Sequence, residues 1–202
     1  MRTELHAGAA VALGRARVDL FVYLDTNVII DIADALSGAW APSSSATEDE
    51  RRLVAAARLF FYGYRSRNQW YLVTSNQGIQ ELTKPGGAGW GASQFHVLDF
   101  ASDAPGQAKR DALAERYVGA GLKSADARHL AAAALSPWVL LFVTSDKRFF
   151  SRSVLLCGPD TLAVVTPQQA EALLDIAPGE VPPISPAPSS PLAAQAPWWI
   201  PN

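Results

Sequence analysis

Four acidic residues of this sequence stand where an α/β protein would place a site. Asp25 and Asp146 each follow a short apolar run of the kind that forms a buried strand, and Glu81 and Asp126 lie in segments with helical spacing of apolar residues. The carboxyl ends of parallel strands share one edge of a sheet, where open α/β proteins bind ligands. We therefore expect the four carboxylates to meet in one cleft.

Carboxylates that are crowded together cannot all stay ionised without a counter-ion. An oxygen-only ligand set suits Mg²⁺ or Mn²⁺ rather than zinc, and such ions activate water and stabilise the charge that develops during phosphodiester cleavage. Asn27 and Thr144 would orient the carboxylates through neutral hydrogen bonds. The pattern thus predicts a metal site that hydrolyses phosphodiester bonds.

Each of these residues also has an ordinary structural explanation. Asp25 or Thr26 would suit the N-cap of the following helix, and Asp126 would suit the positive end of a helix dipole. Glu81 could simply be solvated. His129 lies one turn after Asp126, and we expect it on the surface. The joint occurrence of four acids, rather than any one of them, favours the site.

Hydrophobic spacing predicts strands that alternate with helices. This alternation is typical of a three-layer α/β/α sandwich with a mostly parallel central sheet of about five strands. The strands are expected at residues 20–24, 70–73, 95–100, 139–143 and 162–165, and the helices at 26–36, after Thr47, 76–84, 107–118, 125–135 with Ser124 as cap, and after Thr166.

Arginines are frequent within residues 51–67, and two explanations stay open for them. Charges of this kind usually form the solvated face of a helix. Alternatively, they belong to an RNA-facing edge on which Tyr62, Tyr64 and Trp70 would stack bases.

The bulk composition describes one globular domain. The chain has 202 residues, of which 49% are hydrophobic and 18% charged, and its net charge of −2 offers no general attraction to nucleic acid or to an anionic membrane. The single Cys157 excludes an intramolecular disulfide and a zinc ribbon, and it is compatible with a reducing compartment. No stretch is long and apolar enough to span a membrane, so we expect a cytoplasmic protein.

Four motifs occur in the order and with the kind of spacing found in one enzyme family. They are LDTNVIID at 24–31, SNQGIQEL at 75–82, SADARHLAAAA at 124–134 and TSDKRF at 144–149. Over residues 20–172 the sequence resembles the PIN-domain family of metal-dependent ribonucleases, which includes the VapC-type toxins. The resemblance implies a PIN-like nuclease domain at 19–176. Composition marks a lead-in at 1–18 and a Pro-rich tail at 177–202, and the tail departs from the compact toxin pattern.

The resemblance also implies roles for individual residues. Metal would be bound by Asp25, Glu81, Asp126 and Asp146, with support from Asn27 and Thr144, while Lys147 or Arg148 would meet substrate phosphate. The implied cofactor is Mg²⁺ or Mn²⁺, and the implied activity is that of an endoribonuclease. Partners would be an RNA substrate, an antitoxin protein if the chain is a toxin, and a second copy in a homodimer. On this reading, replacing Asp146 by alanine should abolish cleavage and leave the fold intact.

Two other functions fit parts of this pattern. A haloacid-dehalogenase-like phosphatase also begins with an aspartate after the first strand, but it needs a second aspartate as general acid where this chain has Asn27. A catalytically silent PIN-like scaffold that binds RNA or protein would predict a broken acid set, whereas all four acids are present. The Gly-rich loop at 85–93 lacks the ending of a phosphate-binding P-loop.

Overall fold

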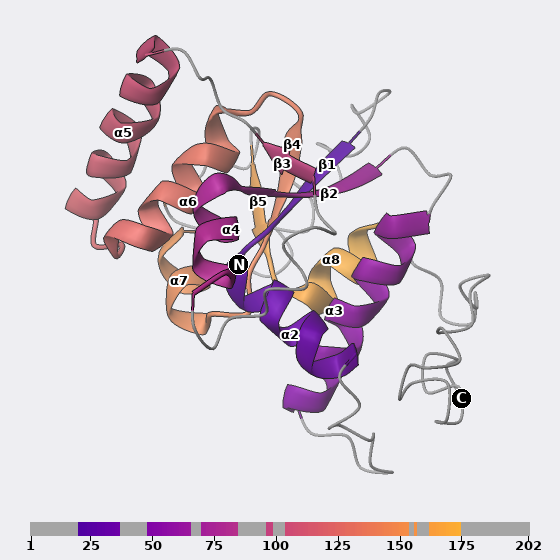
Figure 1. Cartoon of the computed structure of the whole chain (residues 1–202). Helices are drawn as coiled ribbons and strands as arrows, with labels where there is room; N and C mark the ends of the chain where they lie inside the picture. Colours follow the sequence, from indigo (N-terminus) through magenta and orange to yellow (C-terminus); the bar gives the residue numbers. More distant parts are fainter. Residues whose placement is uncertain are drawn as a thin grey trace, which may run out of the picture.

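The computed structural model describes residues 20–36, 48–65, 70–84, 96–98, 104–153, 156 and 162–174 (Figure 1). The predicted lead-in, the Gly-rich loop, the Pro-rich tail and Cys157 lie outside these residues. Among the helices of the described part, none is long and apolar enough to cross a membrane.

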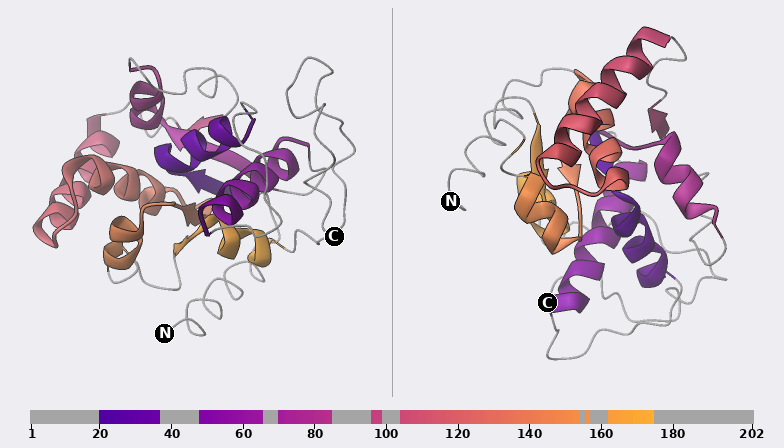
Figure 2. Two further views of the ribbon diagram at one scale, coloured as in Figure 1. Left: turned by 90° about the horizontal axis from the view of Figure 1, so that it is seen from below. Right: turned by 90° about the vertical axis from the view of Figure 1, so that its left-hand side faces the viewer.

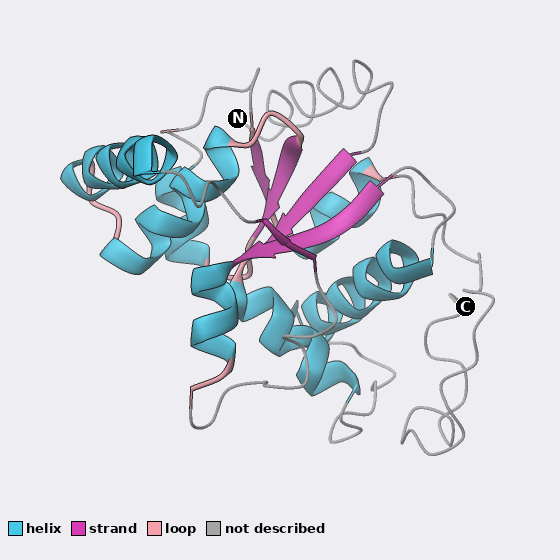
Figure 3. Ribbon diagram, turned by 45° about the horizontal axis from the view of Figure 1, so that its top comes forward, coloured by secondary structure: helices cyan, strands magenta, loops and turns pink. Residues whose placement is uncertain are grey.

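An all-parallel sheet runs through the centre of the fold (Figure 3). Its four principal strands are β1 (Leu20–Leu24), β2 (Trp70–Ser75), β4 (Val139–Val143) and β5 (Ala163–Val165), and the short β3 (His96–Leu98) pairs with β2 at one edge. The order is β3-β2-β1-β4-β5. Strand order reverses between β1 and β4, and such a switch point leaves a crevice at the carboxyl ends of the strands.

Helices cover both faces of the sheet (Figure 2). They are α2 (Thr26–Leu36), α3 (Glu48–Arg65), α4 (Asn76–Leu82), α5 (Ala104–Gly119), α6 (Ser124–Leu135), α7 (Lys147–Ser153) and α8 (Pro167–Leu173). Val22 and Leu24 of β1 point into a core with α2, α3 and α8, whereas Tyr23 points into a second core with α5, α6 and α7. Burial on both faces explains why the strands carry uninterrupted apolar runs.

The predicted α/β fold with a parallel sheet is confirmed, with differences at element ends. β2 runs two residues past the predicted end at Val73, and β3 spans only three residues of the predicted 95–100. Ser124 is not a cap: α6 begins at Ser124 itself, and Lys123 before it makes no side-chain capping bond. Helix α7 (Lys147–Ser153) was not predicted.

Two of the arginines in the 51–67 segment form ion pairs with neighbouring helices. Arg52 makes two hydrogen bonds of 3.1 and 3.3 Å to the buried Asp31 of α2. Arg58 bonds Glu171 of α8 at 2.7 Å, and Arg51 pairs with a neighbour on its own helix. Arg52 and Arg58 therefore join α3 to α2 and α8, which argues against the RNA-facing edge at these positions. The aromatic side chains of that segment lie outside the described part.

Candidate functional site

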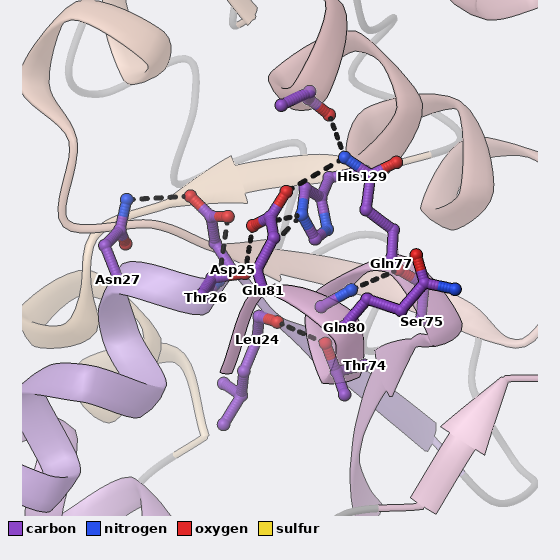
Figure 4. Close-up of polar contacts among 12 residues, drawn as sticks. Leu24, Asp25, Thr26, Asn27, Thr74, Ser75, Gln77, Gln80, Glu81 and His129 are labelled. Atoms are coloured by element: carbon purple, nitrogen blue, oxygen red, sulfur yellow. Dashed lines mark hydrogen bonds and ion pairs between the residues drawn. The ribbon is translucent and has the colours of Figure 1, made fainter. Parts of the chain in front are cut away.

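Asp25 lies at the carboxyl end of the central strand, where three donors hold its carboxylate (Figure 4). Its side chain is almost fully buried. Oδ1 accepts from the backbone N–H of Thr26 at 2.9 Å, and Oδ2 accepts from Asn27 Nδ2 at 2.9 Å and from Thr144 Oγ1 at 2.8 Å. The backbone N–H of Asp25 donates to the Val143 carbonyl at 3.0 Å, so the pairing of β1 with β4 extends up to the acid.

Asn27 connects the two segments that leave β1 and β4. Its Nδ2 donates to Asp25, while its Oδ1 accepts from the backbone N–H of Ser145 at 3.0 Å. The orientation of the amide is therefore fixed at both ends. An aspartate here would lose the donor and set a second carboxylate against Asp25. Asn27 and Thr144 thus make the contacts expected of them, and their part in metal binding stays a prediction.

Glu81 reaches the end of β1 from helix α4. Its carboxylate accepts hydrogen bonds from Thr26 Oγ1 at 2.8 Å and from Gln77 Nε2 at 2.9 Å, and His129 Nε2 lies 3.2 Å away. These contacts, that of His129 above all, lower the pKa of Glu81 to about 2, although burial opposes the shift. Glu81 is therefore ionised and well compensated in the folded protein.

His129 is buried, so the expected surface position is wrong. Only 1% of the residue is exposed, and its Nδ1 lies 2.6 Å from the Tyr23 hydroxyl. Both ring nitrogens thus have polar partners, which removes most of the cost of placing an imidazole in the core. The partners come from β1 and α4, elements distant in sequence from α6.

The partners of His129 favour its protonated form. Its Nδ1 lies 2.6 Å from the Tyr23 hydroxyl, which also bonds Ser75 Oγ at 2.8 Å, and its Nε2 lies 3.2 Å from the carboxylate of Glu81. Burial alone would lower the pKa of His129, but the hydrogen bond to Glu81 and the charges of Asp25, Glu81 and Asp126 together raise it.

Asp126 is repelled by the charges of the other two aspartates. Burial raises the pKa of Asp126, and the charges of Asp25 and Asp146 raise it further, although Lys123 and His129 act in the opposite direction. Burial also raises the pKa of Asp25, and the charge of Glu81 adds to this. Within the described part of the chain none of the three aspartates forms a salt bridge. The predicted acids therefore differ: Glu81 is compensated, whereas Asp25 and Asp126 are buried near other negative charges.

The donor chemistry of this group fits a hard divalent cation. Among the described residues, no three His, Cys, Asp or Glu side chains are arranged to hold one ion together. Mg²⁺ retains several waters and takes one or two carboxylates directly, so it does not require a closed cage of side chains. Carboxylate oxygens that repel one another suit Mg²⁺ or Mn²⁺, and no cysteine occurs among the described residues to favour zinc.

Asp146 has a structural contact as well as its place in the acid group. Its Oδ1 accepts from the backbone N–H groups of Arg148 at 2.7 Å and Phe149 at 3.1 Å, which makes it the N-cap of α7. The cap holds Phe149 in contact with Phe142, where the two rings lie 5.2 Å apart. Lys147 and Arg148 lie exposed in the first turn of α7, and their contact with substrate phosphate stays a prediction.

Asp146→Ala should lower the free energy of unfolding by about 1 kcal/mol, because two backbone N–H groups lose their acceptor. Asp146→Asn retains an acceptor oxygen and should stay within about 0.5 kcal/mol of the wild type. Urea unfolding followed by tryptophan fluorescence measures both. Equal stability of the alanine variant and the wild type would contradict the capping role. The asparagine variant is therefore the better probe of catalysis.

The stability of the metal-free protein should fall as pH rises above about 6.5, the unfolded pKa of a histidine. The raised pKa of His129 means that the folded state binds this proton more tightly than the unfolded state does. Its contribution is complete below the unfolded pKa of about 6.5 and is lost as pH rises through the folded value. Urea midpoints in EDTA measure the slope, which should be flatter in His129→Gln. A stability that rises over this range would contradict the charged histidine.

Sequence reasoning missed Tyr23, Ser75 and the burial of His129. One signal was present: Tyr23 interrupts the apolar run LFVYL with a hydroxyl that needs a partner when the strand is covered on both faces. Comparison with family models, with curated proteins and with solved structures finds no match to this chain. The functional assignment therefore depends on the residues of the site and their geometry.

Proposed function

We propose that this chain is a metal-dependent endoribonuclease of the PIN-domain type. The observation that carries the proposal is the charge that Asp25 and Asp146, which follow β1 and β4, exert on Asp126 in the first turn of α6. Helices on both faces and the order β3-β2-β1-β4-β5 support the three-layer PIN-like arrangement. A toxin role with an antitoxin partner, and a homodimer, follow from the resemblance alone.

The roles proposed for the residues follow from their contacts. Asp25, Asp126 and Asp146 would hold Mg²⁺ or Mn²⁺, which when bound supplies an activated water and stabilises charge on the scissile phosphate. Asn27 and Thr144 fix the carboxylate of Asp25. Thr26 donates to both Asp25 and Glu81, so it fixes the position of one carboxylate relative to the other. The exposed cations in the first turn of α7 would bind substrate phosphate.

Asp25→Asn should reduce cleavage of single-stranded RNA about 100-fold or more. Loss of a residue that only supports a metal ligand typically costs about 10–100-fold, so loss of a proposed ligand should cost at least the upper value. The assay compares labelled RNAs with Mg²⁺ or Mn²⁺ against an EDTA control. Glu115→Gln removes an exposed acid of α5 and should cleave like the wild type. Cleavage that survives both EDTA and Asp25→Asn would overturn the proposal.

A catalytically silent RNA-binding scaffold is the second candidate. It is favoured by the lack, within the described residues, of three side chains arranged to hold one ion. Calorimetry with Mn²⁺ on the wild type and on Asp25→Asn separates the two candidates. Binding by the wild type that is lost in the variant supports the nuclease, whereas no binding by either protein, with RNA affinity retained, supports the scaffold.

The phosphatase alternative finds less support. Both ends of the Asn27 amide are occupied, by Asp25 and by Ser145, and an amide cannot act as a general acid. The position that would protonate a leaving group is therefore used to orient Asp25.

A further inference from the structure

A polar cavity of about 310 Å³ opens beside the site, between α4, α5 and α6. Its volume is at the lower end of the range of about 300–1,000 Å³ for ligand pockets, and so is suited to one small ligand. The side chains that decide its chemistry are Asn76, Gln77, Gln80, Arg110, Asp111 and Arg128.

The cavity shares a wall with the candidate site. Gln77 lines the cavity, and its Nε2 also donates to Glu81 Oε1 at 2.9 Å. Gln77 and Gln80 lie on the same helix as Glu81, and Figure 4 shows the ring of His129 in contact with the Glu81 carboxylate. Arg128 lines the cavity from α6, next to His129 in sequence. A ligand in the cavity would therefore lie one side chain away from Glu81.

The charge of the lining favours an anion. Arg110 is paired with Asp111 at 3.2 Å, so these two residues largely offset one another. Arg128 is exposed and makes no ion pair with any residue that the structure describes. One guanidinium is thus left to bind an anionic group, and guanidinium groups bind phosphate through paired hydrogen bonds.

The neutral lining favours a ligand with both hydrogen-bond donors and acceptors. Asn76, Gln77 and Gln80 place three amides around the cavity. Amide side chains match the edges of nucleic-acid bases, which also alternate donors and acceptors. An apolar ligand would find little to contact, because Ala132 is the only apolar side chain among the described lining residues. The Watson–Crick edge of a base is free for such contacts only in an unpaired nucleotide.

We propose that this cavity binds one unpaired nucleotide of an RNA strand, with Arg128 on its phosphate and the amides of Asn76 and Gln80 on its base. The inference deepens the proposed nuclease function and rests on it for the choice of RNA. The strand would then run from the cavity past Gln77 to the acid group. The cavity accordingly selects single-stranded over duplex RNA.

The test measures binding in EDTA, so that no cleavage is needed. A fluorescein-labelled single-stranded RNA dodecamer of mixed sequence is titrated with protein, and anisotropy is recorded at several salt concentrations. Arg128→Gln should weaken binding about tenfold and make the slope of log K against log salt shallower by about 0.7, the value for one phosphate contact on a single strand. Gln80→Ala should weaken binding without changing that slope.

Arg116→Gln is the matched control, because Arg116 is an exposed arginine of α5 that does not line the cavity. It should bind RNA like the wild type. Equal effects of Arg116→Gln and Arg128→Gln, equal affinity of the wild type for duplex RNA, or no measurable RNA binding would each overturn the proposal. Thermal unfolding confirms that the variants fold.

Failure of this inference is distinguishable from failure of the nuclease. If the protein cleaves RNA in an Asp25-dependent manner but Arg128→Gln leaves its RNA affinity unchanged, only the proposed nucleotide binding in the cavity is refuted. A protein that binds RNA through Arg128 but never cleaves it refutes only the nuclease.

Discussion

His129→Leu should lower the free energy of unfolding by about 2–4 kcal/mol, the scale for removing one partner of a largely buried charged pair. The variant leaves Glu81 without its closest cation and the Tyr23 hydroxyl without one of its two partners. Leucine fills a similar volume, so the loss reports the polar contacts rather than a cavity. Urea unfolding of the metal-free protein measures it.

Two further substitutions separate the contacts of this histidine. His129→Gln places an amide near the position of Nε2 and should retain part of the bond to Glu81, whereas His129→Asn retains a group near Nδ1 that faces Tyr23. We expect the glutamine variant to be the most stable of the three, because it preserves the contact with the charged partner. A leucine variant as stable as the wild type would show that the ion pair contributes nothing to the fold.

Local sequence signals were sufficient for most of the architecture. The bounds of β1, α2 and β4 are those predicted, because each is a continuous apolar pattern with a clear break at its end. The start of α8 was equally readable: Thr166 and Gln169 form the predicted capping box. Signals of this kind lie within a few residues of one another, so no tertiary information is required.

Local sequence signals did not predict the internal arrangement of the site. The acids were identified because strand ends meet at one edge, but the difference between a compensated Glu81 and a repelled Asp126 depends on the position of His129. The histidine is held by Tyr23 and Glu81, which lie 106 and 48 residues away. Partners at such separation leave no periodic pattern. The cavity was missed for the same reason, since three helices contribute to it.

The division of the acids has a consequence for metal binding. Glu81 is hydrogen-bonded by Thr26, Gln77 and His129, so a cation would have to compete with contacts that already stabilise its charge. The aspartates gain from a cation, because it removes the repulsion that raises the pKa of Asp126. We therefore expect the aspartates to dominate metal affinity and Glu81 to act mainly by positioning.

Gly78→Ala should destabilise the protein by about 1–3 kcal/mol, the usual cost of overpacking a filled core. A β-carbon at this position of α4 would clash with Thr74 Oγ1 and come within 3.4 Å of His129 Cε1. Thr74 cannot easily give way, because it is fully buried and its hydroxyl donates to the Leu24 carbonyl at 3.1 Å. The absence of a side chain at residue 78 thus lets α4 approach β2 and bring Glu81 to His129.

A double-mutant cycle tests this cause directly. Thr74→Ala removes the clashing oxygen, so Gly78→Ala should cost less in that background than in the wild type, and alanine's better helix propensity of about 1 kcal/mol could then become visible. Gly119→Ala is the control, since a β-carbon there meets nothing within 4 Å. If Gly78→Ala cost the same in both backgrounds, the close approach to Thr74 would not be what excludes a side chain. In that event α4 must hold Glu81 against His129 by some means other than tight packing on β2.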